Sequence, residues 1–269
     1  MTPPNLPRSI DLAGQFLFLG TGTSTGVPMI GCDCATCTSD NPKNKRTRCS
    51  VVLGLPEGNL LIDTTPDLRS QMLREGIGIV HSLLFTHDHA DHILGLDDVR
   101  AFNYFLGGPL PTYCEDFVED RLRRSFDYAF DPEAPHHGGG VPQIEFRRIA
   151  TEPFSVLGER IIPIRLGHGR FRVLGFRIGN VAYCTDTNLI PEVSLPLLDG
   201  LDVLVLDALR PRPHSTHFGL DQAIAAARHL RPKRTLFTHM SHELEHQATN
   251  ATLPEGMELA YDGLRLPLR

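Results

Sequence analysis

The stretch 83–95, LLFTHDHADHILG, restricts what this chain can fold into more than any other. Residues 83–86 are apolar or β-favouring and predict a buried strand. That strand runs directly into a turn whose residues are His87, Asp88, His89, Ala90, Asp91 and His92. A strand end followed by a loop holds side chains rigidly and turns them toward a cleft. Since imidazole and carboxylate are ligands of zinc, manganese and iron, the stretch predicts a metal site.

The alternative is a solvated loop that is merely rich in histidine. The chain has 13 histidines in 269 residues. At that frequency, three histidines and an aspartate in this pattern are expected by chance in about one of several hundred such chains. The pattern therefore favours the metal site.

Composition limits the partners of this chain. Its 41% hydrophobic and 22% charged residues are ordinary for a globular protein, and 269 residues suffice for a substantial core. The net charge of −6 argues against a nucleic-acid partner, which needs a basic face. Residues 1–14 lack the apolar core of a signal peptide, and no stretch approaches the roughly 18–20 apolar residues of a membrane span. We expect a cytoplasmic protein with no membrane partner, and a homodimer is left open.

Three later segments carry ligand-type residues beside predicted strands. His168 lies between the strands predicted at 160–166 and 171–178, Asp186 follows a strand at 180–184, and His239 follows a strand at 234–237. Taken alone, each of these residues can be explained as an ordinary polar loop residue. A further carboxylate, Asp63, ends the strand predicted at 59–62 and is also a candidate ligand.

Three of the six cysteines, Cys32, Cys34 and Cys37, lie too close together to cross-link distant parts of a fold. In a reducing compartment this spacing favours a tetrahedral zinc, which needs one more ligand from elsewhere. The alternative is three cysteines that are only reduced. The preceding glycine-rich loop 20–26 has the spacing GxGxxxG and no helix pattern after it, so it predicts a tight turn near the active site, not a nucleotide cofactor site.

The HxHxDH motif, the opening loop GTGTSTGVP and the GCxCxxC insertion together resemble the metallo-β-lactamase-fold hydrolases. Within them, the chain is most similar to the PhnP-like phosphoribosyl cyclic-phosphate phosphodiesterases. The resemblance implies an α/β (α+β) fold, a four-layer αββα sandwich that forms a single domain over 1–269. Its two sheet-rich halves would be about 15–115 and 143–269.

The resemblance also implies a ligand set. His87, His89 and His168 would bind one divalent metal, and Asp91, His92 and His239 would bind a second. Asp186 would bridge the two metals, which are zinc or manganese with iron as a third option. Asp63 would orient a metal-bound histidine instead of binding. His242 would complete a structural zinc site with the three cysteines, and Cys49 is the rival fourth ligand.

The resemblance further implies hydrolysis of a small, cyclic phosphodiester by a hydroxide shared between the metals. Asp91 and Asp186 would hold the catalytic metals. The protonating acid would be His217, with His214 as the weighed alternative. Apart from the resemblance, Arg210 or Arg212 is a candidate for holding the phosphate oxygens. Arg46 and Arg48 are further phosphate-binding candidates.

Two other functions compete with this interpretation. A tRNase Z-like endoribonuclease fits poorly with the acidic charge and with the lack of a recognisable basic arm. A PqqB-like protein of a cofactor pathway fits poorly with the full second ligand set. The region 100–160 is longer than in PhnP and would influence substrate choice. Its loop 131–142, with His136 and His137, is interpreted as a surface loop, with a lid as the alternative.

Overall fold

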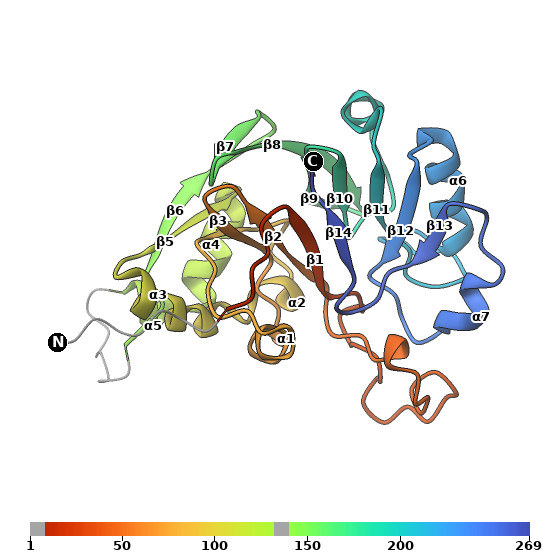
Figure 1. The fold of residues 1–269 in the computed structure, drawn as a ribbon, viewed down its shortest axis with the longest axis horizontal. Helices are drawn as coiled ribbons and strands as arrows, with labels where there is room; N and C mark the ends of the chain where they lie inside the picture. The colour runs from red at the N-terminus through yellow and green to blue at the C-terminus, as the bar shows by residue number, and fades with distance from the viewer. Residues whose placement is uncertain (1–8, 132–139) are drawn as a thin grey trace.

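The computed structural model describes residues 9–131 and 140–269. Within these residues the chain forms two seven-stranded sheets (Figure 1). The first sheet has the order β14-β1-β2-β3-β4-β5-β6. Its strands are β1 (Gln15–Gly20), β2 (Ser50–Leu55), β3 (Gly58–Ile62), β4 (Ser82–Leu84), β5 (Leu110–Cys114), β6 (Ile144–Arg148) and β14 (Arg265–Pro267).

The second sheet has the order β13-β12-β11-β10-β9-β8-β7. Its strands are β7 (Phe154–Val156), β8 (Glu159–His168), β9 (Phe171–Ile178), β10 (Val181–Cys184), β11 (Val203–Asp207), β12 (Arg234–Thr238) and β13 (Met257–Leu259). The predicted division into halves at 15–115 and 143–269 is wrong in detail. Strand β6 pairs in parallel with β5, and β14 pairs antiparallel with β1, so two strands of the second half complete the first sheet.

Strand β1 shows why the sheets stack as they do. Side chains alternate across a strand, and both faces of β1 are apolar. Phe16 and Phe18 face the second sheet and pack with Tyr183 and other residues of both sheets, whereas Leu17 and Leu19 face the helices. Neither sheet can therefore bury its inner face without the other.

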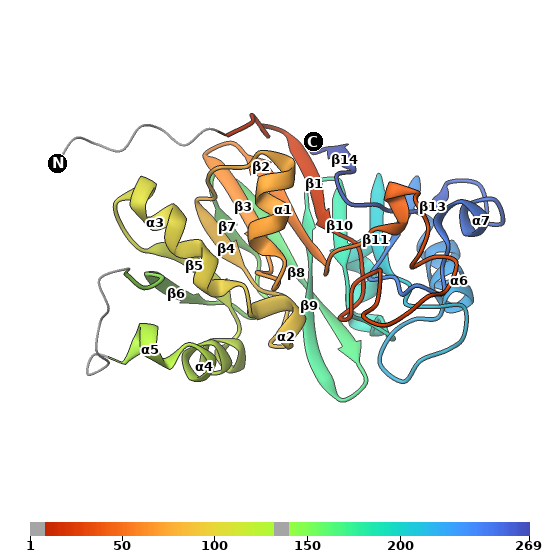
Figure 2. The same ribbon diagram turned by 90° about the horizontal axis from the view of Figure 1, so that it is seen from below.

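Helices cover the two outer faces (Figures 1 and 2). The first sheet is covered by α1 (Leu68–Glu75), α2 (Ala90–Ile93), η2 (Leu96–Val99), α3 (Arg100–Leu106), α4 (Asp116–Ser125) and α5 (Asp127–Phe130). The second is covered by η3 (Glu192–Leu198) and α6 (Leu220–Leu230), and α7 (His246–Asn250) lies beside β13. The four-layer αββα sandwich is confirmed.

Some predicted elements differ in extent. The helix expected over 116–130 is interrupted at Phe126, whose ring packs in the core and whose backbone is non-helical. The strand expected at 83–86 is the shorter β4, and the loop expected after it turns into α2 at Ala90. Residues 1–8 and 132–139, with His136 and His137, lie outside the described part of the chain.

The segment between β1 and β2 crosses to the second sheet and lies beside α7 and the residues after β12 (Figure 2). It includes the short helix η1 (Pro42–Asn44). Arg46 attaches it there: its side chain is 1% exposed and donates to the carbonyl oxygens of Ser241 (2.9 Å) and Leu244 (2.6 Å). Burial lowers the pKa of Arg46 to about 10. Arg46 is thus a structural residue and not a phosphate ligand, which corrects the expectation above.

We expect Arg46→Met to lower the free energy of unfolding by about 2–4 kcal/mol, because it removes the side-chain donor to the buried carbonyl of Leu244 and the shorter of the two hydrogen bonds to the carbonyl of Ser241. Urea denaturation of the folded protein measures this loss. Arg48→Met is the matched control, since Arg48 forms a partly exposed ion pair with Asp67 and its removal should cost about 1 kcal/mol or less. Equal losses in the two variants would contradict the structural role of Arg46.

Candidate metal centre

The structure brings the seven predicted metal-binding residues to one edge of the two sheets. His87, His89, Asp91 and His92 follow β4, His168 ends β8, Asp186 follows β10 and His239 follows β12. Their ligand atoms form two groups, each with its atoms within 4.8 Å of one another: His87, His89 and His168, and Asp91, His92, Asp186 and His239. Asp186 Oδ1 lies 3.9 Å from His87 Nε2 and so links the groups.

The backbone is left-handed at three of the residues that face this centre. Asp63, Asp186 and His239 have φ angles of 65°, 54° and 60°. This conformation costs a non-glycine residue of order 1–3 kcal/mol and is found where surrounding structure enforces it, often at functional sites. Here it turns each side chain sharply at or just past the end of a strand.

Hydrogen bonds orient the imidazole rings. His92 Nδ1 donates to Asp63 Oδ2 (2.7 Å), and His168 Nδ1 donates to the carbonyl of Thr216 (2.6 Å). Thr86 Oγ1 gives its own proton to Asp63, so it accepts from His87 Nδ1 at 2.9 Å. Each ring therefore has its Nε2 free to serve as a ligand atom. Asp63 occupies the orienting position that the sequence comparison implied for it.

The electrostatics of the cluster fit a bound cation. The Nε2 atoms of His87, His92 and His239 are buried and make no hydrogen bond within the described residues. Asp186 oxygens lie 3.2 Å from the Nε2 atoms of both His92 and His239. Ring nitrogens that make no hydrogen bond of their own and converge on carboxylate oxygens are a suitable donor set for a divalent metal.

The pKa values in this cluster reflect a balance between burial and the neighbouring charged groups. Burial disfavours a charged His239, but the carboxylates of Asp186, Asp91 and Asp207 together outweigh burial and raise its pKa to about 9. Burial likewise opposes ionisation of Asp186, and the imidazoles of His239 and His92 outweigh it and hold the pKa of this carboxyl well below its usual range. For His87, burial and the neighbouring His92 both act to lower the pKa. A bound cation would replace the protons of the charged rings.

His217 lies beside the centre, with its ring stacked on that of His239 at a centroid distance of 4.6 Å. Its Nδ1 donates to Asp207 Oδ2 at 2.6 Å, and the same oxygen accepts from the backbone N–H of Thr187. Asp207 was not among the predicted site residues. The available signal was a carboxylate at the end of a buried strand, VLVLD. His214 instead lies within 3.3 Å of the backbone nitrogen of Thr216 in its own loop.

The other basic candidates have protein partners. Arg212 is 72% exposed in its side chain and pairs with Glu243 at 2.9 Å. Arg210 donates to the carbonyl of Pro213 in its own loop. Arg48 pairs with Asp67 and donates to the carbonyl of Ser24.

The glycine-rich loop borders the centre through Thr21 and Thr23, which exchange backbone hydrogen bonds with Met240. A Cβ atom on Gly20 would lie 1.9 Å from the carbonyl oxygen of Arg48, and one on Gly22 would lie 2.8 Å from that of Arg46. These glycines therefore permit close backbone packing, as expected of a tight turn beside the site.

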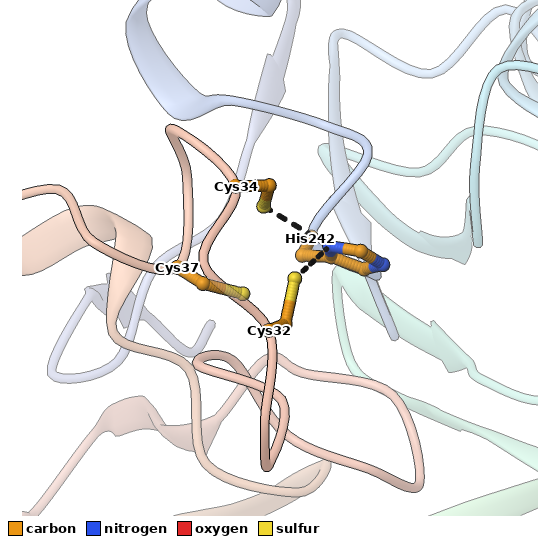
Figure 3. Close-up of side chains that lie close together, drawn as sticks. All are labelled: Cys32, Cys34, Cys37 and His242. Carbon is orange, nitrogen blue, oxygen red and sulfur yellow. Dashed lines mark hydrogen bonds between the residues drawn. The ribbon is translucent and has the colours of Figure 1, made fainter.

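The three neighbouring cysteines and His242 form a second cluster, with ligand atoms within 4.8 Å of one another (Figure 3). His242 Nδ1 lies 3.4 Å from Cys32 Sγ and 3.2 Å from Cys34 Sγ. The contact with His242 lowers the pKa of Cys34 to about 6, whereas burial raises that of Cys37 to about 11.

The rival fourth ligand, Cys49, lies outside this cluster. Its Sγ atom contacts Thr238 Oγ1 at 3.1 Å, and burial raises the pKa of its thiol to about 12.

Comparison with known proteins adds a family context. The sequence model of the beta-lactamase superfamily domain matches residues 58–240. A diphosphatase of the PhnP family, known from its crystal structure, is 44% identical, with a TM-score of 0.88 over 95% of this chain and 98% of its own. The zinc-bound PqqB of Methylobacterium extorquens is 21% identical, with a TM-score of 0.75 over 94% of this chain and 100% of its own, and this likeness concerns the fold.

An octanoyltransferase of Porphyromonas gingivalis is 35% identical over 252 residues, which are 92% of this chain and 50% of that protein. This chain thus spans half the length of that relative. Within the described ranges, no helix has the length and apolar character needed to cross a bilayer.

Proposed function

Because this chain belongs to the beta-lactamase superfamily and is a metal-dependent hydrolase, we propose that it is a binuclear-metal phosphodiesterase that acts on small, cyclic phosphodiesters. The observation that carries the proposal is the pair of ligand groups linked by Asp186, with buried Nε2 atoms that have no hydrogen-bond partner among the described residues. In the proposed assignment, His87, His89 and His168 hold one metal and Asp91, His92 and His239 hold the other. Asp186 lies between them, and zinc or manganese, with iron as a third option, would suit the donors.

A divalent metal pair in this centre would supply Lewis acidity, which stabilises charge on the phosphate oxygens and acidifies the attacking water. The chain supplies the other requirements. Asp63, Thr86 and Thr216 hold the imidazole rings in position. His217 has its Nδ1 proton engaged by Asp207, so its Nε2 is the atom that would deliver a proton to the departing alkoxide oxygen.

The test joins metal analysis to an assay with bis(p-nitrophenyl) phosphate. We expect two metals per chain in addition to any metal at the cysteine cluster. Removal of these metals with a chelator should abolish hydrolysis, and manganese or zinc should restore it. A protein that hydrolyses the ester equally well after its active-centre metals are removed would contradict the proposal.

A second candidate activity is hydrolysis of a diphosphate linkage, and the 44% identical diphosphatase favours it. Both reactions place water on phosphorus, so the same centre would serve. Comparison of a nucleoside 2′,3′-cyclic phosphate with a dinucleoside diphosphate at equal concentration separates them. A tRNase Z-like activity would instead show RNA binding with a steep salt dependence.

We also propose that Cys32, Cys34, Cys37 and His242 hold a structural zinc. The four side chains converge from two segments about 200 residues apart, so a shared ion would attach the 32–37 loop to the residues after β12 (Figure 3). Cys34, with its lowered pKa, supplies the thiolate form that binds zinc. Thiolate sites persist in a reducing compartment, which supports the proposed cytoplasmic location.

We expect Cys34→Ser to remove one zinc per chain and to lower the midpoint of thermal unfolding by about 5 °C or more, because the loop loses its attachment. Zinc analysis and calorimetry measure both effects. Asp33→Asn is the control, since Asp33 is an exposed acidic residue of the same loop. Unchanged zinc content in Cys34→Ser would exclude this assignment.

A further inference from the structure

The loop between β11 and α6, residues 208–219, carries His217 and is held mainly at its ends. At its base the N–H of Leu209 donates to the carbonyl of Phe218 at 2.9 Å, and the Phe218 side chain is buried. Residues 211–213 are exposed and include two prolines, which have no N–H to donate. The position of the residues just before His217 therefore depends on contacts from outside the loop.

The side chain of Asn188, two residues after Asp186, supplies one of these contacts. Its Nδ2 donates to the carbonyl of Ser215 at 2.8 Å, and its Oδ1 accepts from the backbone N–H of Gly169 at 2.9 Å. The two partners fix the orientation of the amide, because only its nitrogen can donate to a carbonyl and only its oxygen can accept from an N–H. One amide thus joins the loop of His217 to the turn that follows β8.

The two loops approach each other closely at this point. Gly169 has a φ of 60°, and a Cβ atom on it would lie 2.7 Å from Thr216 Cγ2. Glycine therefore permits the approach that a side chain would block. It allows His168 Nδ1 and Asn188 Nδ2 to bind the adjacent carbonyls of Thr216 and Ser215.

The backbone on both sides of Asn188 is itself fixed. Its N–H donates to the carbonyl of Gly167 at 2.9 Å, and the N–H of Gly167 donates to the carbonyl of Leu189 at 2.8 Å. On the other side, the N–H of Thr187 donates to Asp207 Oδ2 at 2.8 Å. Asn188 therefore holds the loop from a rigid point of the second sheet.

The position of a proton donor decides whether it works. A general acid must come within about 2.6–3.2 Å of the oxygen that it protonates, and a displacement of about 1 Å can cost about 100-fold in rate. The hydrogen bond from His217 Nδ1 to Asp207 orients the imidazole ring. The place of that ring also depends on the backbone that carries it, which Asn188 holds at Ser215.

We propose that Asn188 is a positioning residue for the proton donor His217 and acts through the carbonyl of Ser215. The inference rests on the proposed function and adds to it a residue outside the candidate ligand groups. Loss of the Asn188 side chain should leave the metals in place and impair proton delivery alone.

The kinetic test compares two esters in Asn188→Ala. Adenosine 2′,3′-cyclic phosphate loses an alkoxide, which needs a proton, whereas bis(p-nitrophenyl) phosphate loses p-nitrophenolate, which does not. We expect kcat for the cyclic ester to fall about tenfold or more. The rate for the nitrophenyl ester should stay within about twofold of the wild-type rate, with unchanged metal content. Equal losses for the two esters, or loss of metal, would overturn the proposal.

Asn180→Ala is the matched control, because Asn180 lies just before β10 and Asn188 lies beyond its other end. Asn180 also joins two segments through its amide: it donates to Asp202 Oδ2 at 3.2 Å and accepts from the backbone N–H of Arg269 at 2.8 Å. Its replacement removes the same number of side-chain hydrogen bonds at the opposite end of the strand. We expect Asn180→Ala to change neither rate by more than about twofold.

A double-variant cycle tests whether Asn188 and His217 act as one unit. In the His217→Ala background, Asn188→Ala should change the rate for the cyclic ester by less than about twofold, because the donor that Asn188 positions is already gone. A further loss of about tenfold in that background would mean that Asn188 acts elsewhere, and the proposal would fail.

Hydrogen exchange separates this inference from the proposed function, because it needs no substrate. In the metal-loaded protein, the backbone amides of 214–218 should exchange about fivefold faster in Asn188→Ala than in the wild type, as one lost hydrogen bond predicts, and at the wild-type rate in Asn180→Ala. If the wild type hydrolyses neither ester but this faster exchange is present, the phosphodiesterase proposal fails and Asn188 still holds the loop. Unchanged exchange in Asn188→Ala overturns the role of Asn188 even in an active enzyme.

Discussion

Asp186→Ala should lower kcat/KM for bis(p-nitrophenyl) phosphate by at least about 100-fold and deplete the active centre of metal. Loss of an orienting partner of a metal ligand already costs 10–100-fold in typical sites, and Asp186 is placed as a ligand itself. Its oxygens lie 3.2 Å from His92 Nε2 and from His239 Nε2, and 3.9 Å from His87 Nε2. Among the residues that the structure describes, alanine removes the one carboxylate that approaches both ligand groups.

The experiment measures metal content and initial rates on the same protein samples, with circular dichroism to establish that each variant is folded. Asp199→Ala is a suitable control, because Asp199 is an exposed aspartate at the end of η3 and lies outside the candidate ligand groups. Wild-type metal content together with wild-type activity in Asp186→Ala would end the two-metal proposal. Metal loss in the Asp199 control as well would point to general instability of the fold.

His217→Ala should keep its metals and lose turnover in a way that depends on the leaving group. An alkoxide needs a proton as it departs, and a positioned general acid contributes about 10²–10⁴-fold. For adenosine 2′,3′-cyclic phosphate, whose leaving group is an alkoxide, we expect a loss of that order. For bis(p-nitrophenyl) phosphate the loss should be much smaller, since p-nitrophenolate is a weak base that departs without a proton.

The comparison of the two substrates makes this prediction specific to acid catalysis. Because His217 stacks on His239, its removal can also disturb the metal centre, and such a disturbance would slow both substrates equally. His214→Ala serves as the matched variant from the same loop and should change neither rate by more than a few-fold. Equal losses for the two substrates in His217→Ala would remove the proton-donor role.

The sequence alone was sufficient to predict the helices and strands that local residue patterns encode. Strand β1 and the hairpin of β2 and β3 follow from apolar runs and turn residues, and α1 and α6 follow from helical spacing. The sequence also predicted the chemical type of the site, since histidine and aspartate at the ends of buried strands indicate metal ligands. The pairing of distant positions, such as His87 with His168, depended on resemblance to a known family.

Other features required the tertiary structure, because they depend on contacts between residues far apart in the chain. Arg46 looks like part of a basic surface run, yet packing buries it under the carbonyls of Ser241 and Leu244. Asp207 acquires its role only when His217 is folded back onto it. The left-handed backbone at Asp63, Asp186 and His239 has no local sequence signal, since surrounding structure imposes it.

A cavity beside the metal centre, lined by Arg121, Arg170 and Arg172, shows the same division. A sequence displays Arg121, Arg170 and Arg172 as ordinary exposed cations on a helix and a strand turn. Only the packing of α4 against the β8–β9 turn and the start of β9 gathers them beside His89, where two of them have no carboxylate partner among the described residues. Residue type and spacing determine which chemistry is available to this chain. Long-range packing decides which of those groups meet, since the free energy of burying both sheets selects the pairing and no local preference does.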